Sequence, residues 1–425
     1  MSKEKSVVPS SPSNTKGSSF YYGYIIVLCS FLIMFICFGT NYSSGVFFNR
    51  LLADMHWSRA VTSVGYALAQ FIGGLVGIIT GRLGDRFGPR IVIMACIISL
   101  GAGCAMMSSI DQPWQFYILG MLVGVGFGGA AIPVTVLPSR WFIKHRGLMT
   151  GIVIAGIGTG TIVTPVVAEK LITAFQWRES FIIIGLIALV IGIPAAFFLK
   201  RDPSVIGLTA LGEKEVGTVR KADRENGMTF KEAVRTRQFW VISFTCMFFG
   251  YCVQGVLLHI VPAARSLGID SGIAAFIISF LGLGSILGRV FLGSLSDRIG
   301  EKNTFILALV LGLLSVLSLQ IITSPWMFYI FGVVFGLGYG AVITLMTLMP
   351  ARVFGLLAIG TLVGSITFIY TIGGSLGPIL TGYIFDVTGS YRLAFVIFAI
   401  LAVCAIIMAS MLKPEIRKID KDIPN

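Results

Sequence analysis

Long uncharged stretches alternate with short polar segments along most of this 425-residue chain. Each stretch is about 20 residues or longer, which is the length that an α-helix needs to cross the hydrocarbon core of a bilayer. Only helices and closed barrels satisfy their backbone polar groups in lipid, and continuous apolar runs indicate helices. We predict an all-α polytopic membrane protein with twelve spans, at residues 21–48, 60–80, 91–109, 114–137, 148–168, 180–199, 239–262, 272–295, 304–323, 326–349, 355–383 and 393–412.

One long polar segment separates the first six spans from the last six. It divides the chain into a cytoplasmic tail, an N-terminal six-helix bundle, a cytoplasmic linker, a C-terminal six-helix bundle and a second cytoplasmic tail. We predict these parts at residues 1–20, 21–199, 200–238, 239–412 and 413–425. The end of the linker, residues 228–240, fits either a short amphipathic helix on the membrane surface or a solvated connection.

The two halves repeat one another in sequence. A shift of 212 positions places Pro113–Phe142 on Pro325–Phe354 without a gap, aligning prolines, glycines, aromatic residues and an arginine. The same shift places the loop at residues 81–88 on residues 293–300. Parallel repeats of this kind put a substrate site near the bilayer midplane, between two halves that move against each other.

Charge is scarce and unevenly distributed. Charged residues make up 12% of the chain, against about a quarter in a soluble domain. With the N-terminus in the cytoplasm, 25 Lys and Arg residues fall in cytoplasmic segments and six fall outside. This asymmetry follows the positive-inside rule, so the net charge of +13 reports orientation and contact with anionic lipid rather than nucleic-acid binding. We expect a multi-pass plasma-membrane protein with both termini cytoplasmic.

Several kinds of chemistry are not expected from this chain. All seven cysteines lie inside apolar stretches, so neither disulfides nor a metal site is expected. No nucleophile, metal-ligand set or pair of acids stands at membrane depth, so we expect neither a membrane enzyme nor a cofactor. A sensor that kept a transporter fold would carry a long soluble extension, whereas the predicted tails are short.

The element Gly-x-Leu-x-Asp-Arg-x-Gly follows the second span, and a related copy follows the eighth. It resembles the signature loop of the major facilitator superfamily, and the resemblance covers the whole chain. It implies the major facilitator fold, with twelve transmembrane helices in two pseudo-symmetric bundles. A carboxylate in such a loop meets the positive N-terminus of a neighbouring helix or an arginine. We expect gate loops that latch the inner side, and they contain Gly81, Asp85, Arg86, Gly293, Asp297 and Arg298.

Further segments resemble the monocarboxylate transporters and the related oxalate:formate exchangers. They are Tyr42–Phe48 with Trp57–Ala60, Arg140–Phe142 with Arg146–Gly147, and Arg289 in the eighth span. The chain departs from animal monocarboxylate carriers, because the acid and the lysine often found at and in their first helix are absent where Tyr22–Tyr24 stands. It departs from the oxalate exchangers because the eleventh span has no lysine.

Arg289 is the one charged residue well inside a span, about six residues or roughly 9 Å from the inner end of the eighth. An uncompensated arginine at such depth costs at least about 2.5–3.5 kcal/mol, and such residues usually face a cavity on a substrate path. All 19 acids lie in tails, in loops or near span ends. Because a guanidinium binds a carboxylate through two parallel hydrogen bonds, the missing counter-ion is a candidate substrate. Snorkelling to the inner surface, or bonding to backbone carbonyls, is the alternative.

Three residues join Arg289 as candidates for the substrate site. Ser285 shares a helical face with Arg289, and the repeat places Gly77 opposite the arginine. Tyr339 aligns with Phe127 across the repeat, so the two rings are placed to face each other across a cavity, although aromatic packing alone also accounts for them. Weaker candidates are Tyr251, Gln254 and Tyr370.

His259 is the only histidine in a span, just before Pro262. Histidine is the side chain that most readily exchanges a proton near neutral pH. It is therefore a candidate for substrate binding and proton coupling. The alternative is a structural histidine bonded to a carbonyl in a helix bent by the proline.

A single intramembrane cation favours a substrate with one carboxylate on a small body, such as lactate, pyruvate, acetate or formate. We predict a secondary transporter of a small monocarboxylate, coupled to protons and working by alternating access, with Arg289 binding the carboxylate. Its partners would be the organic anion, a proton and the lipid bilayer. The alternative is an organic-anion exchanger of the oxalate/formate type. A drug exporter would be expected to place an acid in the cavity.

Overall fold

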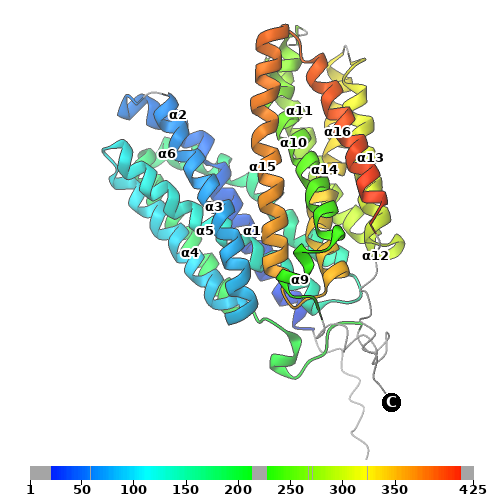
Figure 1. Ribbon diagram of the computed structural model, residues 1–425. Coiled ribbons are helices and arrows are strands. Elements are labelled where there is room, and N and C mark those ends of the chain that lie inside the picture. The colour runs from blue at the N-terminus through cyan, green and yellow to red at the C-terminus, as the bar shows by residue number, and fades with distance from the viewer. Residues whose placement is uncertain are drawn as a thin grey trace, which may run out of the picture.

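A computed structural model describes residues 21–57, 59–212, 227–266, 268–269, 271–322 and 324–412. The predicted tails, at residues 1–20 and 413–425, and the middle of the predicted linker, at residues 213–226, lie outside these ranges. Within them the chain folds into helices without a β-strand. Figure 1 shows the helices gathered into two bundles that follow one another along the chain.

The N-terminal bundle contains six helices and one 3-10 turn. They are α1 (Gly23–Tyr42), α2 (Ser44–Met55), α3 (Arg59–Phe87), α4 (Pro89–Met106), η1 (Met107–Ser109), α5 (Pro113–Trp141) and α6 (Arg146–Phe198). The predicted first span, residues 21–48, is divided at Ser43 into α1 and α2. The 20 residues of α1 already extend about 30 Å, which is the thickness of the hydrocarbon core.

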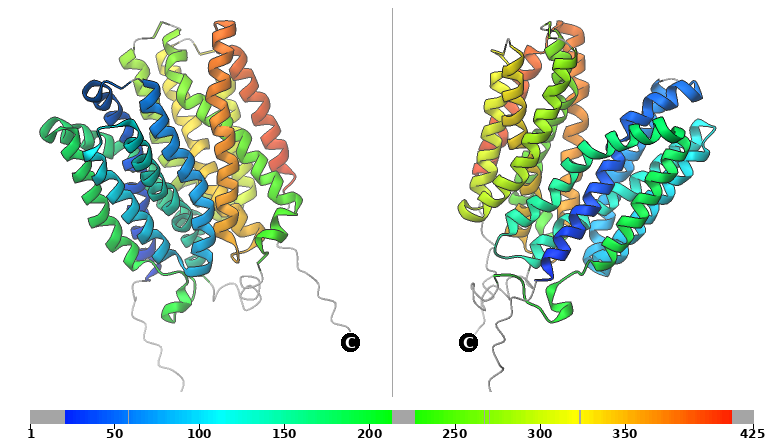
Figure 2. Two further views of the ribbon diagram at one scale, coloured as in Figure 1. Left: turned by 60° about the vertical axis from the view of Figure 1, so that its left-hand side comes forward. Right: turned by 180° about the vertical axis from the view of Figure 1, so that it is seen from behind.

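Helix α6 holds two membrane spans. Its 53 residues would extend about 80 Å if straight, more than twice the thickness of the hydrocarbon core. The backbone leaves the helical region at Gln176, with φ 66° and ψ 173°, and the chain reverses there (Figure 2). With α6 counted twice, the eleven helices that are long and apolar enough to cross a membrane provide twelve spans.

The C-terminal bundle has the same plan as the N-terminal one. Its elements are α10 (Arg237–Ser266), α11 (Ser271–Leu287), the π-helical turn η3 (Gly288–Leu292), α12 (Gly293–Ile299), α13 (Glu301–Ser318), α14 (Pro325–Phe354), α15 (Ile359–Thr388) and α16 (Arg392–Ser410). Two short helices precede it, η2 (Pro203–Ile206) and α9 (Phe230–Val234). The predicted eighth span is thus α11, η3 and α12 in succession.

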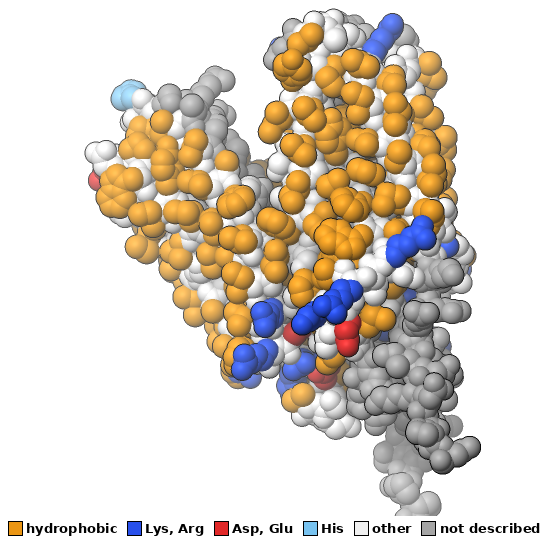
Figure 3. Space-filling view, viewed as in Figure 1, with side chains coloured by type: hydrophobic (Ala, Val, Ile, Leu, Met, Phe, Trp, Pro, Cys, Tyr) orange, Lys and Arg blue, Asp and Glu red, His pale blue; other side chains and the backbone are white. Residues whose placement is uncertain are grey.

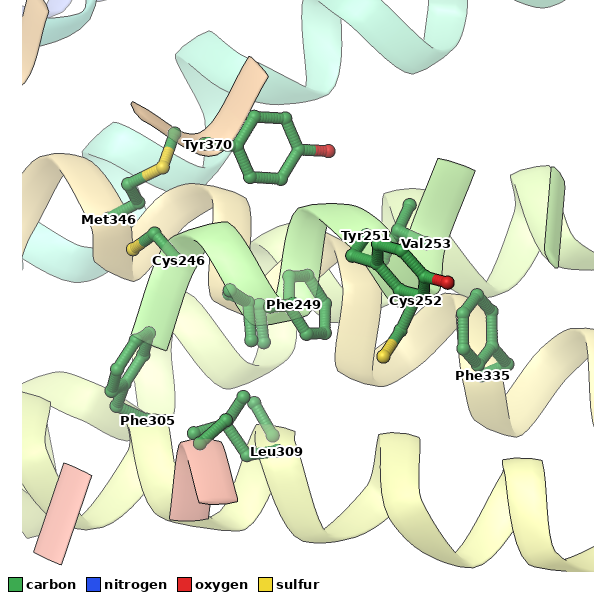
Figure 4. Close-up of a cluster of buried hydrophobic side chains, with 14 of the residues drawn as sticks. Cys246, Phe249, Tyr251, Cys252, Val253, Phe305, Leu309, Phe335, Met346 and Tyr370 are labelled. Carbon is green, nitrogen blue, oxygen red and sulfur yellow. The ribbon is translucent and has the colours of Figure 1, made fainter. Parts of the chain in front are cut away.

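Each bundle buries its own apolar core. Figure 4 shows part of the C-terminal core, where Phe249, Phe305 and Leu309 pack together and Tyr370 lies at the margin beside Met346. The N-terminal bundle has separate clusters around Trp141 and around Phe116. Within the membrane these cores gain little from water exclusion, so close packing of small residues and dispersion hold the helices together.

The two bundles meet at the end where the described chain begins and stops, and diverge toward the other end (Figures 1 and 2). At the closed end, Ile132 and Val136 of α5 pack against Leu356, Ile359 and Val363 of the C-terminal bundle. Figure 3 shows apolar side chains over most of the visible faces of both bundles, with most charged side chains toward the closed end. This apolar band is the surface that lipid would cover.

Candidate substrate cavity

A cavity of about 390 Å³ lies between the two bundles. Helices α1, α3, α5 and α6 line it on one side, and α10, η3, α14 and α15 line it on the other. Its walls combine apolar side chains with amides and hydroxyls, and Arg289 is the only charged residue of this lining in the part of the chain that the structure describes. A ligand between the bundles would therefore meet one fixed positive charge.

Arg289 is 2% exposed and contacts both halves. Its Nη1 donates a hydrogen bond to the carbonyl of Ile154 in α6, at 3.2 Å. The guanidinium also lies over the ring of Tyr339, 5.8 Å from its centroid. The Nε–H has no hydrogen-bond partner among the described residues. Arg289 therefore bonds to a backbone carbonyl, as one alternative from the sequence analysis had it. It also keeps an Nε–H without a partner among the described residues.

The backbone that carries Arg289 is π-helical, and turns of this kind are frequent at functional sites. The matching region of the first half, around Gly77, lies within the continuous α-helix α3. Helix α6 approaches η3 closely, because a Cβ added at Gly151 would lie 2.0 Å from the Arg289 carbonyl oxygen. Only glycine fits there, so α6 packs directly on the turn that positions the guanidinium.

Three tyrosines line the same cavity as Arg289. Tyr42 at the end of α1, Tyr339 of α14 and Tyr370 of α15 all line the cavity. Tyr42 and Tyr370 lie close enough to Tyr339 and Arg289 to interact with them electrostatically. Phenol hydroxyls donate and accept hydrogen bonds, so the cluster places neutral donors from both halves beside one guanidinium.

The other predicted site residues are placed differently. Phe127 lines the cavity opposite the C-terminal wall, with its ring 6.0 Å from that of Phe38. Ser285 is 3% exposed and lies outside the cavity lining, where Gly340 of α14 closely approaches its backbone carbonyl.

His259 also lies outside the cavity lining. Its Nε2 is 3.0 Å from the carbonyl of Pro378, and its Nδ1 is 3.4 Å from the hydroxyl of Tyr391. Both partners belong to its own bundle, so this geometry matches the alternative of a structural histidine bonded to a carbonyl.

The first gate loop ties the bundles together at the closed end. Asp85 of α3 accepts hydrogen bonds from the backbone N–H groups of Gly360 and Thr361, at 3.2 and 3.1 Å. These groups belong to the first turn of α15, so the carboxylate meets the positive end of a helix in the other half. Arg140 pairs with Asp85 at 3.2 Å and also donates to the carbonyl of Leu356 at 3.1 Å.

The second gate loop makes the equivalent helix-capping contact, but without an arginine paired to its carboxylate among the described ion pairs. Asp297 accepts from the backbone N–H groups of Gly147 and Leu148 in the first turn of α6, at 2.7 and 3.0 Å. Arg352, the repeat equivalent of Arg140, instead lies 4.0 Å from Glu301.

The remaining residues of the two gate loops support or flank these contacts. Gly81 and Gly293 are among the points where the bundles touch backbone to backbone, against Gly360 and Gly147. Arg86 and Arg298 are exposed at the surface.

Sequence reasoning missed part of the lining. The lining also includes Tyr42, Gln70 and the hydroxyl residues Thr367, Thr371 and Ser375 of α15. Only Tyr42 entered the sequence argument, as part of a family motif. Of the weaker candidates, Gln254 and Tyr370 line the cavity, whereas Tyr251 packs on Phe398 in the core, with ring centroids 5.7 Å apart. The four-residue spacing of hydroxyls along α15 was the available signal.

The family model described as Major Facilitator Superfamily matches residues 30–263 and 244–424. The chain belongs to the Major Facilitator Superfamily. This superfamily member is 25% identical over 404 residues to Monocarboxylate transporter 12 of Mus musculus, covering 88% of this chain and 82% of the relative. It is 26% identical over 389 residues to Monocarboxylate transporter 13 of Bos taurus, covering 88% and 86%.

Solved structures share the fold of this superfamily member. The proton:xylose symporter XylE superposes with a TM-score of 0.71 at 14% identity, over 91% of this chain and 94% of the symporter. The fucose:proton symporter FucP from E. coli gives 0.68 at 14% identity, over 92% and 99%. Relatives and neighbours are transporters, so the protein is a transporter rather than an enzyme. The predicted fold class and the resemblance to the monocarboxylate transporter branch are confirmed.

Proposed function

We propose that this transporter carries a small monocarboxylate, such as lactate or pyruvate, by alternating access between its two bundles. The observation that carries the proposal is Arg289, which is 2% exposed, lines the cavity and has a buried Nε–H without a hydrogen-bond partner among the described residues. A buried guanidinium without a carboxylate partner gains most from an anionic ligand that completes its hydrogen bonds.

The residues around Arg289 favour a substrate with a single carboxylate. One cation neutralises one anionic group, and a second carboxylate in this lining would meet only neutral donors. Tyr42, Tyr339 and Tyr370 would donate to the bound carboxylate, and Phe127 would contact its apolar body. The relatives named monocarboxylate transporters favour the same substrate class.

The side of the membrane to which the cavity opens, and the residues that line it, bear on the mechanism of proton coupling. The basic excess of the tails and linker supports a cytoplasmic position for the closed end, so the described state would be open to the outside. Proton coupling in this cavity would have the substrate carboxylate carry the proton, because no Asp or Glu stands in the described lining. His259, outside the lining, is not needed for this route.

A second candidate function is obligate exchange of organic anions of the oxalate/formate type. The observation that favours it is the same lack of an acidic partner for Arg289 in the described lining. An empty carrier would then expose a buried, unneutralised cation during its return, which is costly in a low dielectric. A bound anion would remove that cost in both directions.

The test is uptake of radiolabelled L-lactate into proteoliposomes with an inward proton gradient, comparing wild type, Arg289→Ala and Arg90→Ala. Arg90, which stacks on the ring of Phe197 outside the cavity, is the matched control for loss of an arginine. We expect uptake by wild type and the control, loss in Arg289→Ala, and competition by acetate and pyruvate. Best competition by oxalate, or a need for internal anion, would favour exchange. Normal uptake by Arg289→Ala would refute the site.

A further inference from the structure

A row of hydroxyls lies along the face of α15 that borders the cavity. Thr367, Thr371 and Ser375 are spaced four residues apart and all belong to the lining. Each hydroxyl donates to the backbone carbonyl four residues earlier, at 2.8, 2.9 and 2.9 Å. Because the single hydroxyl proton is used in this way, what remains for a ligand is the lone pairs of each oxygen. The row therefore presents hydrogen-bond acceptors to the cavity.

The amide of Gln254 from α10 lies beside this row. A Cβ added at Gly374 would lie 3.0 Å from the Gln254 Cγ, so the side chain packs against α15 at the glycine between Thr371 and Ser375. Gln254 itself lines the cavity. An amide both donates and accepts, so it complements the acceptor row, and the two helices together form a polar surface.

The charge of the lining determines what this surface can bind. Among the described lining residues there is no Asp or Glu, so a cationic ligand group would find no counter-ion. Arg289 is the only cation of that lining, and it is already committed to the carboxylate in the proposed function. A group held at the polar surface is therefore uncharged, and the excess of acceptors calls for a hydrogen-bond donor.

We propose that the cavity contains a second subsite, formed by Thr367, Thr371, Ser375 and Gln254, for a hydroxyl or amide group at the end of the substrate remote from its carboxylate. The inference rests on the proposed function, because it takes the carboxylate to be bound at Arg289. A purely alkyl monocarboxylate would leave the free lone pairs of the hydroxyl row and the Gln254 amide without water and without a ligand group when the bundles close, which opposes closure. The volume of about 390 Å³ lies in the range of sites for ligands larger than lactate.

The test compares ω-hydroxy acids with the unsubstituted acids of the same chain length in proteoliposomes. Three pairs are measured: 3-hydroxypropionate with propionate, 4-hydroxybutyrate with butyrate, and 5-hydroxypentanoate with pentanoate. We expect wild type to prefer the hydroxy acid in at least one pair, by roughly tenfold or more in kcat/KM. In Thr371→Val and in Gln254→Leu that ratio should fall by about fivefold, the effect of one net hydrogen bond.

Thr381→Val is the matched control. Thr381 lies on the same helix and its hydroxyl makes the same bond four residues back, to Gly377 at 2.7 Å, but it is 0% exposed and lies outside the lining. Its ratio should equal that of wild type. Because both acids of a pair are measured on the same protein, a loss of folded transporter cancels from the ratio.

Two kinds of result distinguish failure of the second subsite from failure of the proposed function. Equal transport of both acids in every pair, or a ratio unchanged in both Thr371→Val and Gln254→Leu, would overturn the second subsite and leave carboxylate transport intact. Transport of neither acid, or normal transport of both by Arg289→Ala, would overturn the proposed function, and the second subsite with it.

Discussion

Single side chains around Arg289 decide how an anion would be held. Tyr339 lines the cavity, and its ring face lies 5.8 Å from the guanidinium, measured to the ring centroid. In the proposed site its hydroxyl would donate to the bound carboxylate. These two contributions are separable, because phenylalanine keeps the ring and removes only the hydroxyl. Cation–π attraction of about 0.5–2 kcal/mol would therefore survive the exchange, whereas a hydrogen bond to a bound carboxylate would be lost.

We expect Tyr339→Phe to raise the KM for lactate roughly tenfold or more, since a hydrogen bond to a charged group is worth about 1.5–3 kcal/mol. The measurement is the concentration dependence of uptake. Tyr251→Phe is the control, because Tyr251 packs in the core against Phe398 and its loss should leave the KM unchanged. An unchanged KM in Tyr339→Phe would remove this hydroxyl from the site.

The bonds of His259 to Pro378 and Tyr391 lead to a separate expectation. His259→Phe should lower the free energy of unfolding by about 1–2 kcal/mol through the loss of these bonds, while the pH dependence of uptake per folded molecule stays the same. Thermal unfolding in detergent and a pH series of uptake check the two parts. A shift in the pH profile of uptake in His259→Phe would contradict this expectation and indicate that His259 takes part in proton coupling.

At the scale of elements, the π-helical turn η3 of one bundle packs against helix α6 of the other, and this contact lies at the residue that would bind the substrate. Gly151 leaves no room for a side chain above the carbonyl of Arg289, and Gly158 approaches its Nη1. The same helix accepts the guanidinium hydrogen bond at Ile154. Movement of α6 against η3 therefore changes the position of the cation directly.

Gly151→Ala should displace η3, because its Cβ would lie 2.0 Å from a backbone oxygen, and we expect at least a tenfold loss of kcat for lactate uptake. Such overpacking typically costs about 1–3 kcal/mol. Gly282→Ala on the adjoining α11 is the control, because an added Cβ there meets nothing within 4 Å and alanine favours the helix. Equal rates in both variants would show that the contact tolerates displacement.

For the whole molecule, the two carboxylates of the gate loops set which end is closed. Asp85 and Asp297 each cap a helix of the opposite bundle, but Asp85 is 11% exposed and paired with the equally buried Arg140. Asp297 has no such arginine among the described ion pairs. The latch is therefore asymmetric, although the sequence motif is repeated.

We expect Asp85→Asn to destabilise the closed end by about 1.5–3 kcal/mol, because it removes the negative charge that accepts from the first turn of α15 and one of the two ion pairs of Arg140. Asp297→Asn should have a smaller effect. Spin labels at Val64 and Tyr383, near the diverging ends of α3 and α15, would report the change as a shift toward shorter distances in the Asp85 variant. Identical distance distributions in the two variants would contradict an asymmetric latch.

The sequence predicted the spans and the repeat because run length and aligned glycines depend on local composition alone. It singled out Arg289 because a charge in an apolar run stands out without any knowledge of packing. The positions of Ser285 and His259 depended on helix register and on partners such as Gly340 and Pro378 in distant segments. The π-helical turn arises where α14 and α6 press on η3, and composition does not encode that contact.

Because Arg289 is the one cation of the described cavity lining, carrying an anion without a proton would make the two halves of a transport cycle respond differently to voltage. When a monoanion is bound without a proton, as in anion exchange, the site carries no net charge, so a membrane potential does little work on the loaded carrier. The empty carrier presents one positive charge, on which the potential acts with up to about 2.3 kcal/mol per 100 mV if the full field is crossed. An inside-negative potential would therefore set the rate of the empty return while leaving substrate-for-substrate exchange almost untouched.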